Sequence, residues 1–473
     1  MKTECNKKRY TFQALGRREI LADFNGGTIT SDAGGILLRE VEKRTGILSR
    51  FSRCFTDYRN QKLIEHSVLD LVSQRVFAIA LGYEDLNDHD QLARDHFFAS
   101  LVGKEDPTGE YRQLERDKGQ PLAGKSTLNR LELTPEDADE KSRYKKIVMH
   151  PTAIDELLVD VFIESRANAP EQIILDLDAT DIPLHGQQEE RFFHGYYDTY
   201  CYLPLYIFCG DDLLCARLRP ANIDGAAGSI DELKPIITRI RATWPEVQII
   251  LRGDSGFCRE EIMSWCEEPD NNVDYLFGLA KNNRLLREIE DELEEARIML
   301  EHSGEPSRRF KEFMYQTLDS WSRFRRVVGK AEQLPGRSNP RFVVSSLSAD
   351  DYDDRALYED IYCARGDMEN RIKEKQLMLF ADRTSSAKMR ANQLRLYFST
   401  IAYLLMQTLR RIGLSGTSMP RAQMDTIRLK LFKISAQIKI TVRKIWVSCT
   451  SCYPYMDFFN QVYRNLQQMP LRS

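Results

Sequence analysis

Three acidic residues of this 473-residue chain stand where the local pattern can assemble them into one site. Asp178 follows the run 173–177, which is apolar except at Asp176, and Asp254 closely follows a second mainly apolar run at 247–251. Glu369 lies in a long stretch with the spacing of a helix. Carboxylates at the ends of adjacent strands, with a third from a helix, can hold two Mg²⁺ ions, because Mg²⁺ prefers oxygen ligands and keeps positions open for phosphate oxygens. Such a site suits cleavage and transfer of phosphodiester strands.

The first ligand has two candidates. Asp176 stands two positions before Asp178, and residues two apart on a strand point to the same face. We favour Asp178, which Ala179 and Thr180 follow. The other carboxylate of the pair then caps or hydrogen-bonds the neighbouring turn, although either residue fits the pattern of a metal ligand.

Cations surround Glu369 at helical spacing. Tyr362, Arg365 and Glu369 fall at i, i+3 and i+7, which places them on one helical face. Lys373 continues this face, and Lys375 points away from it. The pattern predicts a metal ligand flanked by side chains that bind phosphate. A surface ladder of ion pairs is the alternative.

A basic segment near the end of the chain is a further candidate for binding DNA. Residues 410–444 carry nine Lys or Arg and a single acidic residue, Asp425. Among them, Arg428, Lys430 and Lys433 are interleaved with apolar residues. Such cations can contact a phosphate backbone, and a solvated face with spare charge is the alternative.

Trp321 stands beside Arg323, Arg325 and Arg326. An aromatic ring among arginines can stack on an unpaired base near a cut DNA end. The alternative is a Trp that packs the small core of its own segment. The spacing leaves both interpretations open.

Three short motifs carry less weight. Residues 119–126 match the phosphate-binding loop of ATPases around Lys125, but the residues before them are polar and do not form the buried strand that such a loop follows. We expect Ser126 to cap a helix instead. Residues 253–256 echo a serine-protease motif that has no His-bearing partner. Cys449 and Cys452 lack the second ligand pair that zinc needs, so we expect buried thiols in a helix.

The residues around Glu369 resemble the Tyr-x2-Arg-x3-Glu signature, with a downstream Lys, of DDE transposases from bacterial insertion sequences. The whole chain is similar to the thirteen-eighty group of these elements. The matching segments are residues 31–34, 82–88, 176–180, 185–187, 252–257 and 369–374. The wider signature places Lys seven residues beyond Glu, where this chain has Gln376, so that Lys373 or Lys375 substitutes.

This resemblance implies a fold, a reaction and partners. It implies an RNase H-like catalytic core and a triad of Asp178, Asp254 and Glu369 that binds Mg²⁺, with Mn²⁺ as a possible substitute. It also implies recognition of double-stranded DNA, both the terminal inverted repeats and the target. Transposases of this kind usually act as homodimers on paired ends. A nuclease that cuts without joining, a catalytically inactive DNA-binding protein and an ATPase acting on DNA are the alternatives.

The order of predicted elements gives an α/β protein with a mixed sheet. Residues 1–165 are mostly helical, and we expect this region to bind DNA. Residues 166–282 and 339–415 are the two parts of the catalytic core, the second of which carries the Glu369 helix. Residues 283–338 are a β-rich and helical insertion between them, since a strand–helix–strand unit needs only about 30 residues. Residues 416–473 are a basic C-terminal region.

Composition sets broad limits on the class of protein. Hydrophobic residues make up 42% of the chain and the formal net charge is −4, an ordinary globular balance that excludes a uniformly basic DNA coat. The apolar runs are too short to span a membrane, and the first residues lack the apolar core of a signal peptide. We therefore expect a cytoplasmic protein with no membrane partner, and the resemblance to transposases of insertion sequences implies a bacterial protein that acts on the nucleoid.

Overall fold

The computed structural model describes residues 9–472, and their contacts divide the chain into two units. Unit 1 combines Met1–Val148 with Ile401–Ser473, and unit 2 is the continuous segment Met149–Thr400. The boundary falls within helix α14 (Met389–Thr408). Sequence patterns predicted separate regions at the two ends of the chain, whereas most of both regions belongs to unit 1.

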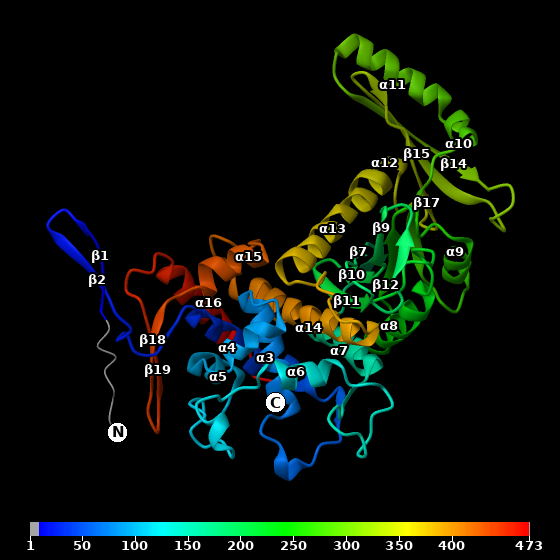
Figure 1. The fold of residues 1–473 in the computed structure, drawn as a ribbon. Coiled ribbons are helices and arrows are strands. Elements are labelled where there is room, and N and C mark those ends of the chain that lie inside the picture. The colour runs from blue at the N-terminus through cyan, green and yellow to red at the C-terminus, as the bar shows by residue number, and fades with distance from the viewer. Residues whose placement is uncertain (1–8, 473) are drawn as a thin grey trace. The chain divides into compact units, whose positions relative to one another are not determined.

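Unit 2 is built on one large mixed sheet (Figure 1). The strands in spatial order are β11 (Asp212–Arg217), β10 (Leu205–Cys209), β6 (Gln172–Ala179), β12 (Gln248–Gly253), β13 (Asp274–Leu279), β17 (Arg341–Ser345), β15 (Arg325–Leu334) and β14 (Ser307–Tyr315), and β16 (Arg337–Ser338) also pairs with β15. Strands β6, β12 and β13 are parallel, and the other pairs are antiparallel. The predicted α/β class with a mixed sheet is confirmed.

The central strands are buried on both faces, which explains their continuous apolar runs. On one face, Leu175 and Leu251 join a core that includes residues of α8 (Ser229–Thr243) and α9 (Glu260–Glu267). On the other face, Ile174 and Ile250 pack in a second core with residues of the segment 357–362. The odd- and even-numbered positions of β6 and of β12 therefore face opposite layers of unit 2.

The segment that carries Glu369 is helical throughout from Asp354 to Met378. Its parts in chain order are α12 (Asp354–Ala356), a π-helical turn (Leu357–Tyr362), a 3₁₀ turn (Cys363–Arg365), α13 (Gly366–Lys373) and a second π-helical turn (Glu374–Met378). The long helix predicted over this segment is present. Departures from α geometry flank α13 on both sides, and such turns are frequent at functional sites.

Residues 283–338 continue the main sheet. Helices α10 (Asn283–Glu288) and α11 (Glu290–Ser303) precede the β14–β15 hairpin, and Figure 1 shows α11 along these strands. Strand β15 hydrogen-bonds to β17, and Leu285 and Ile289 belong to the same core as the central strands. The segment predicted as an inserted subdomain is thus an extension of the core sheet.

Unit 1 is mainly helical. Its longer helices are α1 (Ile36–Thr45), α3 (Val68–Leu81), α5 (His96–Val102), α6 (Lys125–Glu132) and α16 (Met456–Gln468). Helix α3 has a cap at each end, because Ser67 and Asp70 form a reciprocal capping box and Gly82 ends the helix with φ 99°. Short strands complete the unit: β3 (Ile29–Thr30), β18 (Ala436–Ile440) and β19 (Ile445–Cys449) form one sheet, and β1 (Tyr10–Leu15) and β2 (Arg18–Ala22) form a hairpin.

Within residues 9–472, no helix is both long and apolar enough to cross a membrane.

Candidate active site

The register of two parallel strands determines where the two aspartates of the predicted triad lie. Strand β6 pairs with β12 so that Asp176 lies opposite Arg252 and Leu177 lies opposite Gly253. One position further along, the same register brings Asp178 beside Asp254. Neighbouring strands are about 4.8 Å apart, so these carboxylates stand at the same edge of the sheet. Asp178 and Asp254 are even-numbered positions, like Ile174 and Ile250, so they are on the face of the sheet that is covered by the helical segment of Glu369.

Arg365 connects the helix to the sheet edge. Its Nη2 lies 2.6 Å from Oε1 of Glu369, and its Nη1 lies 3.7 Å from Oδ1 of Asp178. Glu369 is partly exposed, whereas the side chain of Asp178 is largely buried. One guanidinium therefore bridges the carboxylates that come from β6 and from α13.

The electrostatics of Asp178 indicate that the three carboxylates lie within reach of one another. Burial raises the pKa of Asp178 to about 6, Arg365 opposes this rise, and the negative charges of Asp254 and Glu369 add to it. Like charges gathered in this way favour a bound cation, because a cation removes their mutual repulsion. The same three side chains that the sequence predicted are thus brought together.

Asp176 has a different environment. It is 2% exposed, and its two carboxylate oxygens accept hydrogen bonds from Arg252. Arg252 also donates to the backbone carbonyl of Ile361, at the end of the first π-helical turn. Asp176 thereby fixes Arg252 between β12 and the Glu369 segment. This arrangement favours Asp178 over Asp176 as the first ligand.

The donor chemistry of the site fits a hard divalent cation, since all three candidates are carboxylates. In residues 9–472, no three His, Cys, Asp or Glu side chains are grouped so that they could hold a metal ion as they stand. The Arg365 guanidinium instead supplies the positive charge beside Asp178 and Glu369. A metal ion bound at this edge would have to displace Arg365 from these oxygens.

The two lysines beyond Glu369 differ sharply. Lys373 is exposed, as a phosphate contact requires. Lys375 is fully buried, and its Nζ lies 4.7 Å from the ring centre of Tyr206 and has no hydrogen-bond partner among residues 9–472. Burial lowers its pKa well below the ordinary value. Gln376, at the position where the wider signature has Lys, donates to the backbone carbonyl of Asp181.

Trp321 lies in the core of unit 2. It is 6% exposed, and its ring meets the Tyr315 ring edge-on with centroids 5.8 Å apart. The guanidinium of Arg325 lies 5.4 Å from the Trp321 ring centre. This placement favours the packing interpretation over stacking on an unpaired base.

The basic residues predicted to bind DNA in the C-terminal region make internal contacts in unit 1. Arg428 donates to the carbonyl oxygens of Ile79 and Ala80 at the end of α3. Lys433 pairs with Asp32 at 2.6 Å. Lys430 lies over the ring of Tyr455 at 5.3 Å. These contacts stabilise unit 1 and leave less of the positive charge available for phosphate than the sequence alone indicates.

The smaller motifs have structural explanations. Lys125 opens α6 and pairs with Asp90 at 3.0 Å, and no strand precedes it within the described segment 112–118. The cap of this helix is Gly124, so the prediction of Ser126 as the cap is wrong by two residues. Cys449 and Cys452 are exposed, at the end of β19 and in the following turn, so the prediction of buried thiols in a helix is also wrong. An alternation of apolar residues in 436–447 was the available signal for strands.

A pocket of about 280 Å³ adjoins Asp254. Strand ends provide one side of it and the helical segment with Tyr362 and Arg365 provides the other. Two of its cations, Lys281 and Arg341, were missed in the sequence. The available signal was a basic residue directly beyond the apolar strand β13 and another at the first position of β17.

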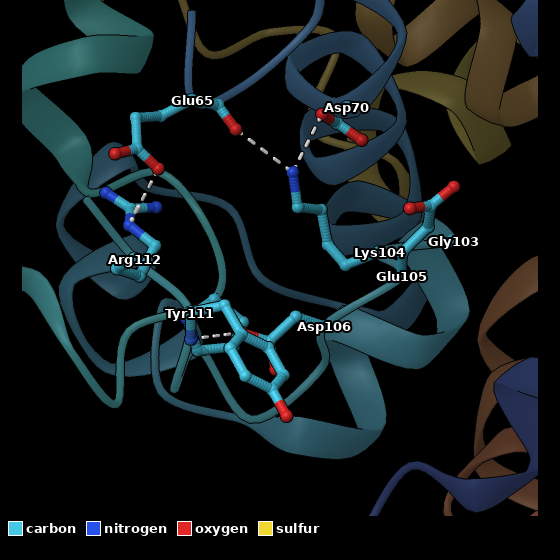
Figure 2. Close-up of a pocket in the computed structure, with 9 residues that line it drawn as sticks. Glu65, Asp70, Gly103, Lys104, Glu105, Asp106, Tyr111 and Arg112 are labelled. Carbon is cyan, nitrogen blue, oxygen red and sulfur yellow. Dashed lines mark hydrogen bonds and ion pairs between the residues drawn. The ribbon is translucent and has the colours of Figure 1, made fainter. Parts of the chain in front are cut away.

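A second pocket lies in unit 1, and Figure 2 shows that its two basic side chains, Lys104 and Arg112, contact acidic residues of the same pocket. Lys104 contacts Asp70 and the backbone carbonyl of Glu65, and Arg112 pairs with the side chain of Glu65. Glu105 and Asp106 also line it. Acidic side chains outnumber basic ones here, so this pocket does not suit a polyanion.

Comparison with known proteins establishes the class. The family model described as Transposase DDE domain group 1 matches residues 12–471, and the chain belongs to this family. It is thus a DDE transposase, an enzyme that cleaves DNA and transfers strands, and its family generally uses divalent metal ions.

The chain is also similar to a solved piggyBac transposase, in a cryo-EM structure of its synaptic complex with hairpin DNA. The match has 10% identity and a TM-score of 0.44, and covers 85% of this chain and 79% of that chain. No curated protein matches the sequence.

Proposed function

We propose that this transposase mobilises a bacterial insertion sequence of the thirteen-eighty group, and that its core is RNase H-like with a signature of the Tyr-Arg-Glu-Lys type. It binds the terminal inverted repeats of the element, cuts the phosphodiester at each end and joins the freed 3′-hydroxyl to target DNA. The observation that carries this proposal is the grouping of Asp178, Asp254 and Glu369 at one edge of the mixed sheet.

Asp178, Asp254 and Glu369 would hold Mg²⁺, or Mn²⁺ in its place. Two such ions, when bound, activate the attacking oxygen and stabilise the leaving oxygen. Asp176 orients the site through Arg252, since this ion pair ties β6 and β12 to the Glu369 segment. Arg365, placed between two of the ligands, is positioned to neutralise a phosphate that approaches them.

The contacts with the DNA backbone are assigned to side chains that solvent can reach. Lys373 is exposed on the helix of Glu369, and we assign to it the role that the wider signature gives to a downstream Lys. Tyr362 and Arg365 line the pocket beside Asp254 and complete this face. Lys375 contributes to the core, because its ammonium group is enclosed.

A homodimer on paired DNA ends is the proposed active form. The β1–β2 hairpin supports it, since every residue of both strands is exposed, including Phe12 and Leu15. A lone two-stranded hairpin is marginally stable in water, so a second copy of the chain is a natural partner for this apolar surface. We place the protein in the cytoplasm, acting on the nucleoid.

The proposal is tested with a duplex of the DNA that borders the coding region. Purified protein and Mg²⁺ are expected to cut this duplex at the element boundary and to join a pre-cut end to a plasmid. Cutting without joining would support a hydrolytic nuclease instead. Cleavage that requires ATP and is lost in Lys125→Ala would support an ATPase, although the ion pair of Lys125 with Asp90 argues against that role.

A further inference from the structure

The pocket beside Asp254 has the features of a binding site for one strand of DNA. Its volume of about 280 Å³ lies just below the range for small-molecule sites. A single sugar–phosphate unit is small enough to occupy it. Asp254 and Arg365 form part of its wall, so a ligand in the pocket would continue directly into the catalytic edge.

Two cations of this pocket are available for a ligand. Lys281 follows β13, Arg341 begins β17, and both side chains are exposed. Within residues 9–472, neither has a hydrogen-bond or ion-pair partner, whereas Arg365 is engaged with Glu369. Unpaired cations next to a catalytic carboxylate are suited to phosphate, because they offer charge without breaking an existing pair.

The remaining wall is aromatic and closely fitted. The rings of Tyr358 and Tyr362 lie 5.6 Å apart at 43°. Tyr362 approaches β13 at Gly278, where an added Cβ would stand 2.5 Å from the Tyr362 hydroxyl and 3.0 Å from the backbone nitrogen of Ser255. Only glycine at position 278 leaves room for the Tyr362 side chain. The tyrosine wall therefore offers an apolar surface for a sugar ring.

We propose that Lys281 and Arg341 form a phosphate clamp that holds the backbone of one DNA strand, next to the bond that is cut, against the Tyr362 wall. The inference rests on the proposed function. The two cations are positioning residues: they do not reach the reacting atoms but set the path by which the strand enters the Asp254 edge. The two cations hold the DNA equally well before cleavage and in the transition state. Their loss therefore weakens DNA binding and leaves the cleavage rate at saturating DNA nearly unchanged.

The test compares Lys281→Gln/Arg341→Gln with Lys234→Gln/Arg337→Gln, which removes two exposed cations outside the pocket, and with the charge-retaining Lys281→Arg/Arg341→Lys. The DNA concentration for half-maximal cleavage should rise roughly tenfold or more for the pocket pair. The slope of log K against log salt should fall by about 2. The control and charge-retaining variants should behave like the wild type, and single-turnover rates at saturating DNA should agree within about threefold across all variants.

A scan with neutral methylphosphonate linkages locates the contact. In the wild type, one or two linkages beside the cut should reduce affinity, and in the pocket variant these linkages should cause no additional loss. Equal affinity and salt slope in pocket and control variants would overturn the clamp, as would full additivity at every linkage. If the wild type itself fails to cut the DNA, the proposed function fails instead, so the two failures are distinguishable. Thermal unfolding confirms that each variant is folded.

Discussion

The Arg252 guanidinium contacts both carboxylate oxygens of Asp176, with Nε 2.5 Å from Oδ1 and Nη2 2.7 Å from Oδ2. Both side chains are buried, and they belong to the neighbouring parallel strands β12 and β6. This pair separates two carboxylates that both fit the sequence pattern of a metal ligand, and it agrees with the preference for Asp178. Asp176 is committed to Arg252, whereas Asp178, two residues later, faces Asp254, Glu369 and Arg365.

The two aspartates should therefore respond differently to the same substitution. Asp176→Asn leaves Arg252 without its counter-charge and should lower the free energy of unfolding by about 3 kcal/mol. Asp178→Asn should leave stability equal or higher at pH 7.5, because burial raises the pKa of Asp178 to about 6 and the fold disfavours its ionised form. The same Asp178→Asn change should abolish cleavage. Urea unfolding together with an end-cleavage assay measures both effects, and the reverse pattern would assign the ligand role to Asp176.

Arg365 should compete with the metal ion. Arg365→Ala removes the guanidinium that pairs with Glu369 and lies near Asp178, so the apoprotein should bind Mn²⁺ severalfold more tightly. Arg355→Ala is the matched control, because Arg355 pairs with Glu359 earlier in the same helical segment. Electron paramagnetic resonance of free Mn²⁺ measures the affinity without reference to activity. Unchanged or weaker binding in Arg365→Ala would exclude competition.

Lys373 and Lys375 should separate DNA binding from stability. Lys373→Ala should weaken binding to DNA and reduce its salt slope by about 1, since the exposed Lys373 is assigned to phosphate. Lys375→Met should raise the unfolding temperature, because it removes a fully buried amino group that has no hydrogen-bond partner in the described part of the chain. Affinity for DNA should not change in Lys375→Met. A loss of salt slope in Lys375→Met alone would mean that this lysine reaches DNA after a rearrangement.

Sequence patterns predicted much of the fold because the signals for strands and helix ends lie in neighbouring residues. The runs at 173–177 and 247–251 are apolar because their strands are covered on both faces, and each leads directly to a carboxylate at the sheet edge. The limits of α3 can also be recognised in the sequence, since Ser67 and Gly82 cap the backbone directly next to them. The segment 283–338 was harder, because only the pairing of β15 with β17 makes it part of the main sheet.

The parts of the site that escaped prediction depend on contacts between distant segments. The role of Asp176 follows from the register of β6 on β12, which places Arg252 opposite it. The burial of Lys375 depends on β10, where Tyr206 provides the ring beneath its ammonium group. Arg428 is basic in sequence but meets α3 carbonyls far away in the chain. Local spacing indicates neither these partners nor their burial.

Acid should destabilise the protein through His66. Burial, with the nearby charges of Lys104 and Arg112, lowers the pKa of His66 to about 3. In the unfolded chain this pKa is about 6.5, so below that pH the unfolded state gains a proton that the fold does not. His66 should therefore contribute a loss of about 1.4 kcal/mol per pH unit between pH 6 and pH 5. Urea midpoints should show this slope reduced in His66→Gln and retained in His302→Gln, an exposed control; equal slopes would contradict the assignment.

The central claim is that the carboxylates at the sheet edge carry the reaction. The most direct measurement is Mg²⁺-dependent cleavage of a terminal-repeat duplex by Glu369→Gln, beside Asp367→Asn, which removes an exposed charge two residues earlier in α13. Glu369→Gln should bind the duplex with near wild-type affinity and yield no cleavage product, whereas Asp367→Asn should cut normally. Cleavage by Glu369→Gln at a rate near that of the wild type would contradict the account.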